Sequence, residues 1–422
     1  MRLDKARLLR MVKEGGDELV RLCSDLIKVP SDNPPGDTSQ LASYIREYLM
    51  DRGADVRAYE PQKGVVSLVS AAGEDSPHLV LNGHLDQFPG DVGEPWTRLP
   101  HSGAVEGGVI HGRGSGDMKG GLASLMFCYA LICGEEFDGR VTFTGTSDEE
   151  TGGRWGALWL LDNVEGLLGG AVLSGEPSGL TARIGEKGRV PLLIRAIGKA
   201  AHGSFAGYVG ENAIMKMVKA LPGVAELQGL PASLDAETSA LIEEVMKGYR
   251  DQYGHESMSM ADVLRHLTVN VGVVRGGTKE NIVPALCEAE VDIRLPLGFT
   301  PEEVKGLVEE KVRRADPSIE VMWGRHPSVI TGPTYTSPDE PIVKLLEASS
   351  EAATGKAPHL SFTSGGTDCR FWRLRGVPAV SYGPRVYGMG GVDEHISVDD
   401  LLTTALVHMG TVADFLSHSE VH

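Results

Sequence analysis

The chain has 422 residues, of which 41% are hydrophobic and 23% are charged. This composition is typical of folded globular proteins and excludes disordered and collagen-like classes, while the length predicts two or three domains. The 58 acidic and 40 basic residues give a formal net charge of −18. Nucleic acids and anionic membranes bind basic surfaces, so neither is an expected partner. Part of the negative charge could instead bind cations.

The sequence favours a cytoplasmic protein. No stretch reaches the roughly 18 consecutive apolar residues that a transmembrane helix needs. The first residues lead directly into charged helical sequence, without the apolar segment of a secretory signal. The five cysteines are odd in number and form no CxxC pair, which fits a reducing compartment better than a disulfide framework.

The N-terminal part of the chain alternates helix-like and strand-like segments. Apolar spacing and apolar runs predict helices at 17–28, 38–52 and 118–133, and strands at 65–71, 78–85, 141–146 and 171–173. This alternation predicts an α/β domain, in which a mostly parallel sheet carries helices on both faces. Ligands of such sheets usually lie beyond the carboxyl ends of the strands.

The middle of the chain has a different order of elements. It predicts strands at 190–198, 267–274, 285–295 and 319–323, and helices at 212–220 and 301–314. The order β-α-β-β-α-β predicts a smaller α+β domain. A polar stretch at 227–265 is too long for a simple loop, so we expect an insertion with its own helices. We therefore predict an α/β domain at 1–187 and 328–422, interrupted by an α+β domain at 188–327.

Five short segments collect unusual carboxylates and histidines, mostly where a predicted strand ends or a helix begins. They are Gly83–Asp86 with His84, Gly112–Gly121 with Asp117, Thr146–Gly153 with Glu149 and Glu150, Ser174–Ser178 with Glu176, and Asp393–Ser397 with His395. Each has an ordinary explanation on its own: Asp117 could cap a helix, and the acids at 148–150 could form a solvated turn. Together they form a pattern typical of a metal site at one edge of the sheet.

Other catalytic chemistries have weaker support. The nearest match to a GxSxG serine motif fails at its last position, Glu149. Cys369 could act as a thiol nucleophile with His395, but a lone cysteine is more often a small buried apolar residue.

The five segments, in this order, resemble those of the M20 metallopeptidase family, which includes succinyl-diaminopimelate desuccinylase, acetylornithine deacetylase, aminoacylase-1 and glutamate carboxypeptidases. The resemblance covers nearly the whole chain. It implies that His84 and Glu176 bind one metal ion, Glu150 and His395 bind a second, Asp117 bridges both, Glu149 is the general base, and Asp86 positions His84. It implies two divalent ions, with Zn²⁺ favoured and Co²⁺ or Mn²⁺ as alternatives, which could bind hydroxide and polarise an amide carbonyl.

Further segments resemble the family's lid, which is also its dimerisation domain. The resemblance implies that His202, in Ala201–Ser204, stabilises the oxyanion in the active site of a partner subunit. It implies that Asn281 and Arg294 hold the substrate carboxylate, and that Gly366 and Thr367 contact the substrate. A homodimer is therefore expected.

Two departures bear on the substrate. Succinyl-diaminopimelate desuccinylases carry an Arg-rich segment at the start of the lid, where this chain has Glu186–Arg189. The 227–265 insertion is also foreign to their compact lid. We expect an amidohydrolase acting on an N-acyl amino acid, with a metallo-carboxypeptidase or dipeptidase as the alternative and a non-catalytic metal- or ligand-binding relative as a second alternative.

Overall fold

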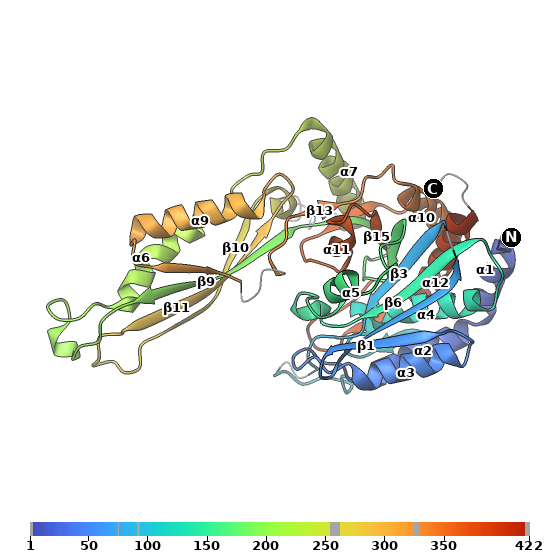
Figure 1. Cartoon of the computed structure of the whole chain (residues 1–422), viewed down its shortest axis with the longest axis horizontal. Helices are drawn as coiled ribbons and strands as arrows, with labels where there is room; N and C mark the ends of the chain where they lie inside the picture. Colours follow the sequence, from blue (N-terminus) through green and yellow to red (C-terminus); the bar gives the residue numbers. More distant parts are fainter. Residues whose placement is uncertain (1–2, 75, 91–92, 254–261, 325–328, 418–422) are drawn as a thin grey trace. The chain divides into compact units, whose positions relative to one another are not determined.

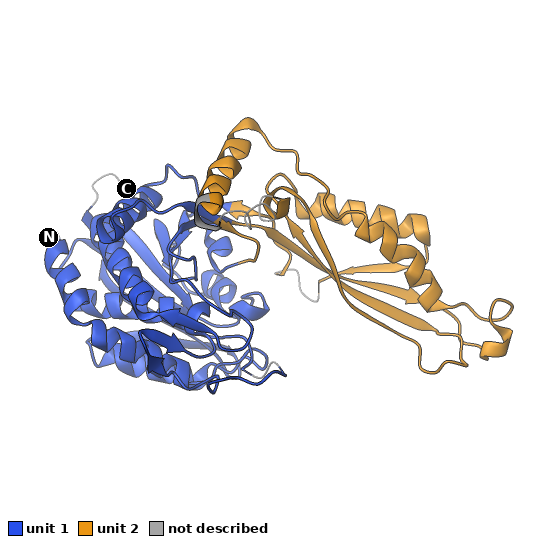
Figure 2. Ribbon diagram, turned by 180° about the vertical axis from the view of Figure 1, so that it is seen from behind, with its two compact units in different colours: residues 1–185, 335–361, 367–422 blue, residues 186–334, 362–366 orange. Residues whose placement is uncertain are grey.

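The computed structural model describes residues 3–74, 76–90, 93–253, 262–324 and 329–417. The chain divides into two compact units (Figure 2). The larger unit contains Met1–Gly185, Tyr335–Ser361 and Thr367–His422, and the smaller unit contains Glu186–Thr334 and Phe362–Gly366.

A nine-stranded mixed sheet forms the centre of the larger unit (Figure 1). The strand order is β1-β2-β6-β3-β7-β15-β8-β13, and β14 pairs with β8. The bounds are β1 Val56–Gln62, β2 Val65–Glu74, β3 His78–His84, β6 Gly139–Thr146, β7 Ala171–Ser174, β8 Ala182–Glu186, β13 Thr334–Tyr335, β14 Leu360–Thr363 and β15 Ala379–Ser381. The central strands β6, β3, β7 and β15 pair in parallel, whereas β1–β2, β2–β6 and β15–β8 are antiparallel.

Helices cover both faces of this sheet. Their bounds are α1 Lys5–Glu14, α2 Gly16–Lys28, α3 Ser39–Met50, α4 Gly120–Cys133, α5 Ala157–Asn163, α10 Pro341–Thr354, α11 Cys369–Arg373 and α12 Val398–Ser417. Val80 of β3 packs in a cluster with residues of α5 and α11. Gly83 of the same strand faces Leu122 of α4, on the opposite side of the sheet. The predicted α/β class is therefore confirmed.

A close approach of two glycines brings α4 against the end of β7. A Cβ atom at Gly121 would lie 1.7 Å from the carbonyl oxygen of Gly175, so no larger side chain fits there. Glu176 follows directly in the chain. The glycines thus hold the segment that carries Glu176 against the start of α4.

The smaller unit has the predicted α+β order. Its four-stranded sheet, β10-β11-β9-β12, is antiparallel at every pairing. The bounds are β9 Gly188–Ile197, α6 Ala213–Ala225, β10 Thr268–Gly276, β11 Leu286–Leu295, α9 Pro301–Ala315 and β12 Glu320–Trp323. Residues of α6 and α9 share one apolar core with alternate residues of β9 and β11. This order confirms the predicted β-α-β-β-α-β arrangement.

The polar insertion contains a helix of its own, α7 at Ala236–Tyr253. Residues 254–261 of the predicted insertion lie outside the described residues. Among the residues that the structure describes, no helix combines the length and the apolar character needed to cross a membrane.

Candidate metal centre

Carboxylates and one histidine converge where the central strands end. His84 is the last residue of β3, Glu149 and Glu150 follow β6, and Glu176 follows β7. Asp117 lies in a kinked turn at Ser115–Lys119, just before α4, and its own backbone is not helical. Ligand atoms of His84, Glu149 and Glu176 lie within 4.8 Å of one another, and so do those of His84, Asp117 and Glu150.

The imidazole of His84 is buried and fixed on both sides. Its Nδ1–H donates to the backbone carbonyl of Asp86 at 2.8 Å. Its Nε2 lies 3.0 Å from Oδ1 of Asp117 and 3.8 Å from Oε1 of Glu176. Because Nδ1 carries a proton, Nε2 is the atom available to a metal ion.

Asp86 contacts the His84 ring through its backbone carbonyl, whereas its carboxylate binds other groups. Its carboxylate lies 3.7 Å from Nδ1 of His84, so the hydrogen bond to the ring comes from its backbone carbonyl instead. The two carboxylate oxygens accept the backbone N–H groups of Glu149 and Glu150, each at 3.1 Å, and the side-chain amide of Asn33 at 2.8 Å. Asp86 thus fixes the turn that carries both glutamates.

The site is crowded with negative charge. Burial raises the pKa of Glu149 to about 7 and that of Glu150 to about 11, and it raises the pKa of Glu176 well above its usual value. Oε1 of Glu150 is buried and has no hydrogen-bond partner among the described residues. Buried carboxylates around a histidine, with one oxygen lacking a donor, fit divalent cations.

Asp117 is part of this cluster and does not cap α4. The helix begins at Gly120, directly after Lys119. The backbone N–H groups of Gly116 and Asp117 are held by Oε1 of Glu394, at 3.0 and 3.4 Å.

His395 approaches from a separate small sheet. It lies on β16 (His395–Ser397), which pairs with β5 (Val109–His111), itself paired with β4 (Val105–Glu106). Its Nδ1–H donates to the carbonyl of Asp393 at 2.8 Å, which leaves Nε2 for a metal ion. Its ring stacks on that of Tyr387, with centroids 5.0 Å apart. Neither of the two 4.8 Å groups found among the described residues includes His395.

Arg370 of α11 contacts Glu149. Its Nη1 donates to Oε1 of Glu149 at 3.2 Å, and both side chains are largely buried. Sequence reasoning missed this arginine, although it follows Thr367 by only three positions. It missed Asn33 and Glu394 as well. For Glu394 a signal was present, because it adjoins His395.

The residues expected in the lid lie at two ends of the smaller unit's sheet. His202 pairs with Ile282 in an antiparallel bridge, and the N–H of Gly203 donates to the carbonyl of Asn281 at 2.7 Å. His202 and Asn281 are therefore neighbours, and both are exposed. Arg294 pairs with Arg189 at the other end of β11.

Gly366 and Thr367 lie where the chain passes from the smaller unit to the larger unit. Gly366 is the last residue of one segment of the smaller unit, and Thr367 begins the final segment of the larger unit. Thr367 is buried.

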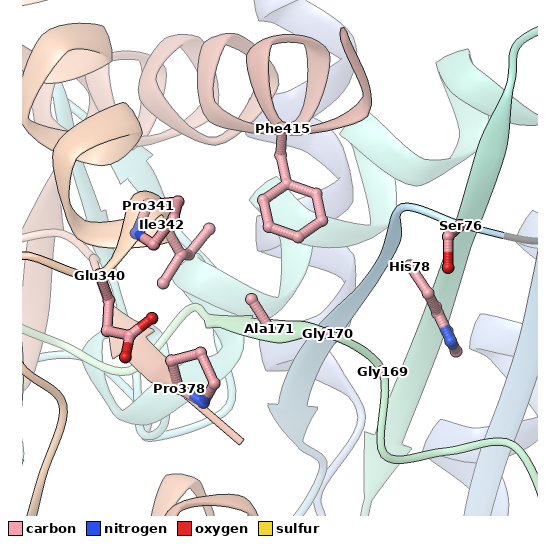
Figure 3. A pocket seen from close by; sticks show the side chains of 10 residues that line it. All are labelled: Ser76, His78, Gly169, Gly170, Ala171, Glu340, Pro341, Ile342, Pro378 and Phe415. Atoms are coloured by element: carbon pink, nitrogen blue, oxygen red, sulfur yellow. The ribbon is translucent and has the colours of Figure 1, made fainter. Parts of the chain in front are cut away.

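A pocket of about 460 Å³ lies at the opposite ends of the same strands (Figure 3). It is lined by His78 at the start of β3, Ala171 at the start of β7 and Pro378 just before β15, with Ile342 and Phe415 also at its walls. Neither group of candidate metal ligands includes a residue of this pocket. It is therefore separate from the candidate metal centre.

The fold and this cluster define an α/β protein with a candidate metal centre, and comparison with known proteins gives the class, a metal-dependent hydrolase, and the family. Residues 80–414 match peptidase family M20/M25/M40, so the chain belongs to this family.

Curated relatives align over almost the whole chain. The succinyl-diaminopimelate desuccinylase of Rhizorhabdus wittichii is 28% identical over 408 residues, which cover 94% of this chain and 98% of that protein. The enzyme of the same name from Hydrogenovibrio crunogenus is 26% identical over 405 residues, which cover 94% and 99%.

Solved structures share the fold. An M20 family metallo-carboxypeptidase from Sulfolobus solfataricus has a TM-score of 0.79 and 21% identity, with 95% of this chain and 100% of that chain covered. The di-peptidase Dug1p from Saccharomyces cerevisiae has a TM-score of 0.79 and 15% identity, with both chains covered completely.

Proposed function

We propose that the chain hydrolyses the amide bond of an N-acyl amino acid, as a deacetylase or desuccinylase does. The observation that carries the proposal is the buried carboxylate cluster around His84, with an oxygen of Glu150 that lacks a donor among the described residues. The names of the curated relatives support the deacylase class.

A peptidase is the alternative within the same family. The solved structures of similar fold include a metallo-carboxypeptidase and a di-peptidase. These enzymes also break an amide bond, so the same residues would serve, and the groups beside the bond would differ. A non-catalytic relative is the second alternative, and the presence of Glu149 argues against it.

The residues present would hold two metal ions. We assign His84 and Glu176 to one ion, Glu150 and His395 to the other, and Asp117 to both. Nitrogen and oxygen ligands of this kind suit Zn²⁺, with Co²⁺ and Mn²⁺ as alternatives. Bound there, the ions would polarise the amide carbonyl and lower the pKa of a water molecule.

Glu149 is the proposed general base. It would take a proton from the attacking water and pass it to the leaving nitrogen. Its hydrogen bond with Arg370 restrains the carboxylate, and Asp86 fixes its backbone N–H. These contacts would hold the base in place while it gains and loses a proton.

The lid residues support a homodimer. The strand from Leu286 to Arg294 spans roughly 26 Å at the rise of an extended chain, and His202 and Asn281 lie beyond its Leu286 end. One copy of the smaller unit could not bring both His202 and Arg294 to one small substrate. We therefore propose that Arg294 serves the site of its own chain, and that His202 and Asn281 serve the site of a partner chain.

Exposed apolar side chains gather at the His202 end. Phe205, Tyr208 and Val209 follow His202 in the chain, and Tyr208 is 94% exposed. Exposed apolar side chains that cluster in this way often mark a protein interface. They support association of two copies at this end of the lid.

A hydrolysis panel with a base-deficient variant tests the proposal. N-succinyl and N-acetyl amino acids and dipeptides would be offered with added Zn²⁺, Co²⁺ or Mn²⁺. We expect hydrolysis of an acyl amino acid, and we expect Glu149→Ala to keep two metal ions per chain by elemental analysis while losing activity. The exposed Glu106→Ala is the control. Cleavage of dipeptides alone would favour the peptidase, and full activity of Glu149→Ala would refute the assigned base.

A further inference from the structure

The short segment Phe362–Gly366 packs with the smaller unit, although the chain before and after it belongs to the larger unit. One reason is a contact with the polar insertion at 227–265. The hydroxyl of Tyr249, in helix α7 of that insertion, donates to the backbone carbonyl of Phe362. The insertion therefore holds the first residue of this segment.

Lys187 makes a second connection between the segment and the insertion. Its backbone N–H donates to the carbonyl of Thr363 at 3.1 Å. Its side chain is buried, and Nζ donates to the carbonyls of Val263 and His266 at 2.7 and 2.9 Å. Two consecutive residues of the segment, Phe362 and Thr363, are thus tied to the two described parts of the insertion.

The insertion is folded firmly enough to act as a support. The N–H of Ala232 donates to the carbonyl of Arg265 at 2.9 Å, so the two ends of the insertion lie side by side. Arg265 also forms an ion pair with Glu243 of α7. The buried apolar residues of α7 are Leu241, Ile242, Val245 and Met246. These contacts fix the helix that carries Tyr249.

The segment itself needs outside support because it ends in two glycines. Gly365 and Gly366 lose more backbone freedom on ordering than other residues would. The N–H of Gly365 donates to Oγ1 of Thr363 at 3.1 Å, so the turn depends on the position of Thr363. Beyond the segment, the buried Asp368 accepts from the hydroxyl of Thr146 at 2.7 Å. The glycines are therefore held between two anchored ends.

We propose that Tyr249 is a positioning residue, which holds segment 362–366 in the conformation that binds substrate. The inference rests on the proposed function and on the expectation that Gly366 and Thr367 contact the substrate. It gives the insertion a role, because its helix α7 would raise substrate affinity without contributing a group to the reaction.

Removal of one hydroxyl group tests this role in the metal-loaded full chain. Tyr249→Phe keeps the ring and loses the hydrogen bond to Phe362. We expect KM for the best N-acyl amino acid of the hydrolysis panel to rise by about 3- to 10-fold, as loss of one hydrogen bond would cause. Because the contact supports binding, kcat should change by less than about twofold, with two metal ions still bound.

Tyr48→Phe is the matched control. The hydroxyl of Tyr48, in α3, donates to Oε1 of Glu18 at 3.1 Å, so the same chemical change removes one hydrogen bond elsewhere. An unchanged KM in Tyr249→Phe, a fall in kcat alone, or an equal rise of KM in both variants would overturn the proposal.

Hydrogen exchange separates this proposal from the proposed function, because it needs no turnover. Mass spectrometry of the metal-loaded chain should show exchange at residues 363–366 faster by about 3- to 10-fold in Tyr249→Phe, and unchanged there in Tyr48→Phe. If no substrate were hydrolysed, the proposed function would fail, and exchange would still decide whether Tyr249 holds the segment. Identical exchange in Tyr249→Phe and the wild type would refute the proposal even in an active enzyme.

Discussion

Arg113 and Glu394 form an ion pair in which neither side chain is exposed to solvent. Nη1 of Arg113 donates to Oε2 of Glu394 at 2.6 Å. The other oxygen of Glu394 accepts the N–H groups of Gly116 and Asp117, and the carbonyl of Glu394 accepts the N–H of Gly112. The pair thus ties the turn that carries Asp117 to the strand that begins with His395.

Removing one partner of this pair should destabilise the protein strongly. Glu394→Ala leaves Arg113 buried without its carboxylate, and we expect the free energy of unfolding to fall by about 3–5 kcal/mol. Glu394→Gln keeps an acceptor for the turn and should cost less. Urea denaturation of the metal-loaded protein measures both changes. The exposed pair of Arg98 and Glu106 is the control, because an ion pair in contact with water contributes little and Glu106→Ala should leave the free energy of unfolding almost unchanged. Similar losses in the two alanine variants would contradict this role.

Metal removal should lower both stability and activity. Without cations, the carboxylates around His84 repel one another in a buried site. At a free metal concentration a hundredfold above Kd, each bound ion should add about 2.7 kcal/mol to the free energy of unfolding. Thermal unfolding and hydrolysis, measured after chelation and again after adding Zn²⁺, Co²⁺ or Mn²⁺, test this. Activity that resists chelation would favour the thiol mechanism through Cys369.

Replacement of Arg370 should slow turnover. Arg370→Gln removes the cation that restrains Glu149, so we expect kcat to fall by at least about tenfold while two metal ions stay bound. Arg375→Gln is a suitable control, because Arg375 lies just beyond α11 and pairs with the exposed Asp162. An unchanged kcat in Arg370→Gln would show that the contact does not serve catalysis.

His408 should make the larger unit sensitive to acid. It is buried in α12, where Nε2–H donates to the carbonyl of Tyr382 and Nδ1 accepts from Ser124, each at 2.7 Å. Burial lowers the pKa of His408 to about 4. Between that value and about 6.5, the unfolded chain binds the proton and the folded chain does not, so stability is full above pH 6.5 and falls as the pH drops.

The expected loss from His408 is about 2 kcal/mol between pH 7 and pH 5. Denaturant unfolding across this range should show a smaller loss in His408→Gln than in the wild type. His359→Gln replaces an exposed histidine and should behave like the wild type. Identical pH profiles for His408→Gln and the wild type would show that His408 is not the source of the acid sensitivity.

Helices and strands that are determined by residues close together in the sequence could be predicted. The helix Pro301–Ala315 has apolar residues at helical spacing, and Thr300 caps it with its side chain. The strand His78–His84 has an apolar centre at 79–81 and is buried along most of its length. The outer strand β2 was also predicted, at 65–71, but its antiparallel pairing with β1 and β6 was not, because pairing direction depends on how distant segments meet.

The candidate site likewise contains residues with a local sequence signal and residues without one. His84 and Glu149 lie beside recognisable strand ends, so their place in one cluster could be anticipated. Asn33 contacts Asp86 across 53 positions of the chain, and Arg370 contacts Glu149 across 221. No local pattern marks either residue. Their contribution depends on tertiary contacts, which a single sequence does not reveal.

The separation of His202 from Arg294 along the lid sheet has a genetic consequence. If the active site of each chain uses His202 of its partner, a chain lacking Glu149 and a chain lacking His202 are both inactive alone. In a mixed dimer, one active site would be complete, because it combines the intact Glu149 of one chain with the intact His202 of the other. Two null alleles of this gene would then complement each other. A defect in the lid of one chain would inactivate the active site of its partner chain.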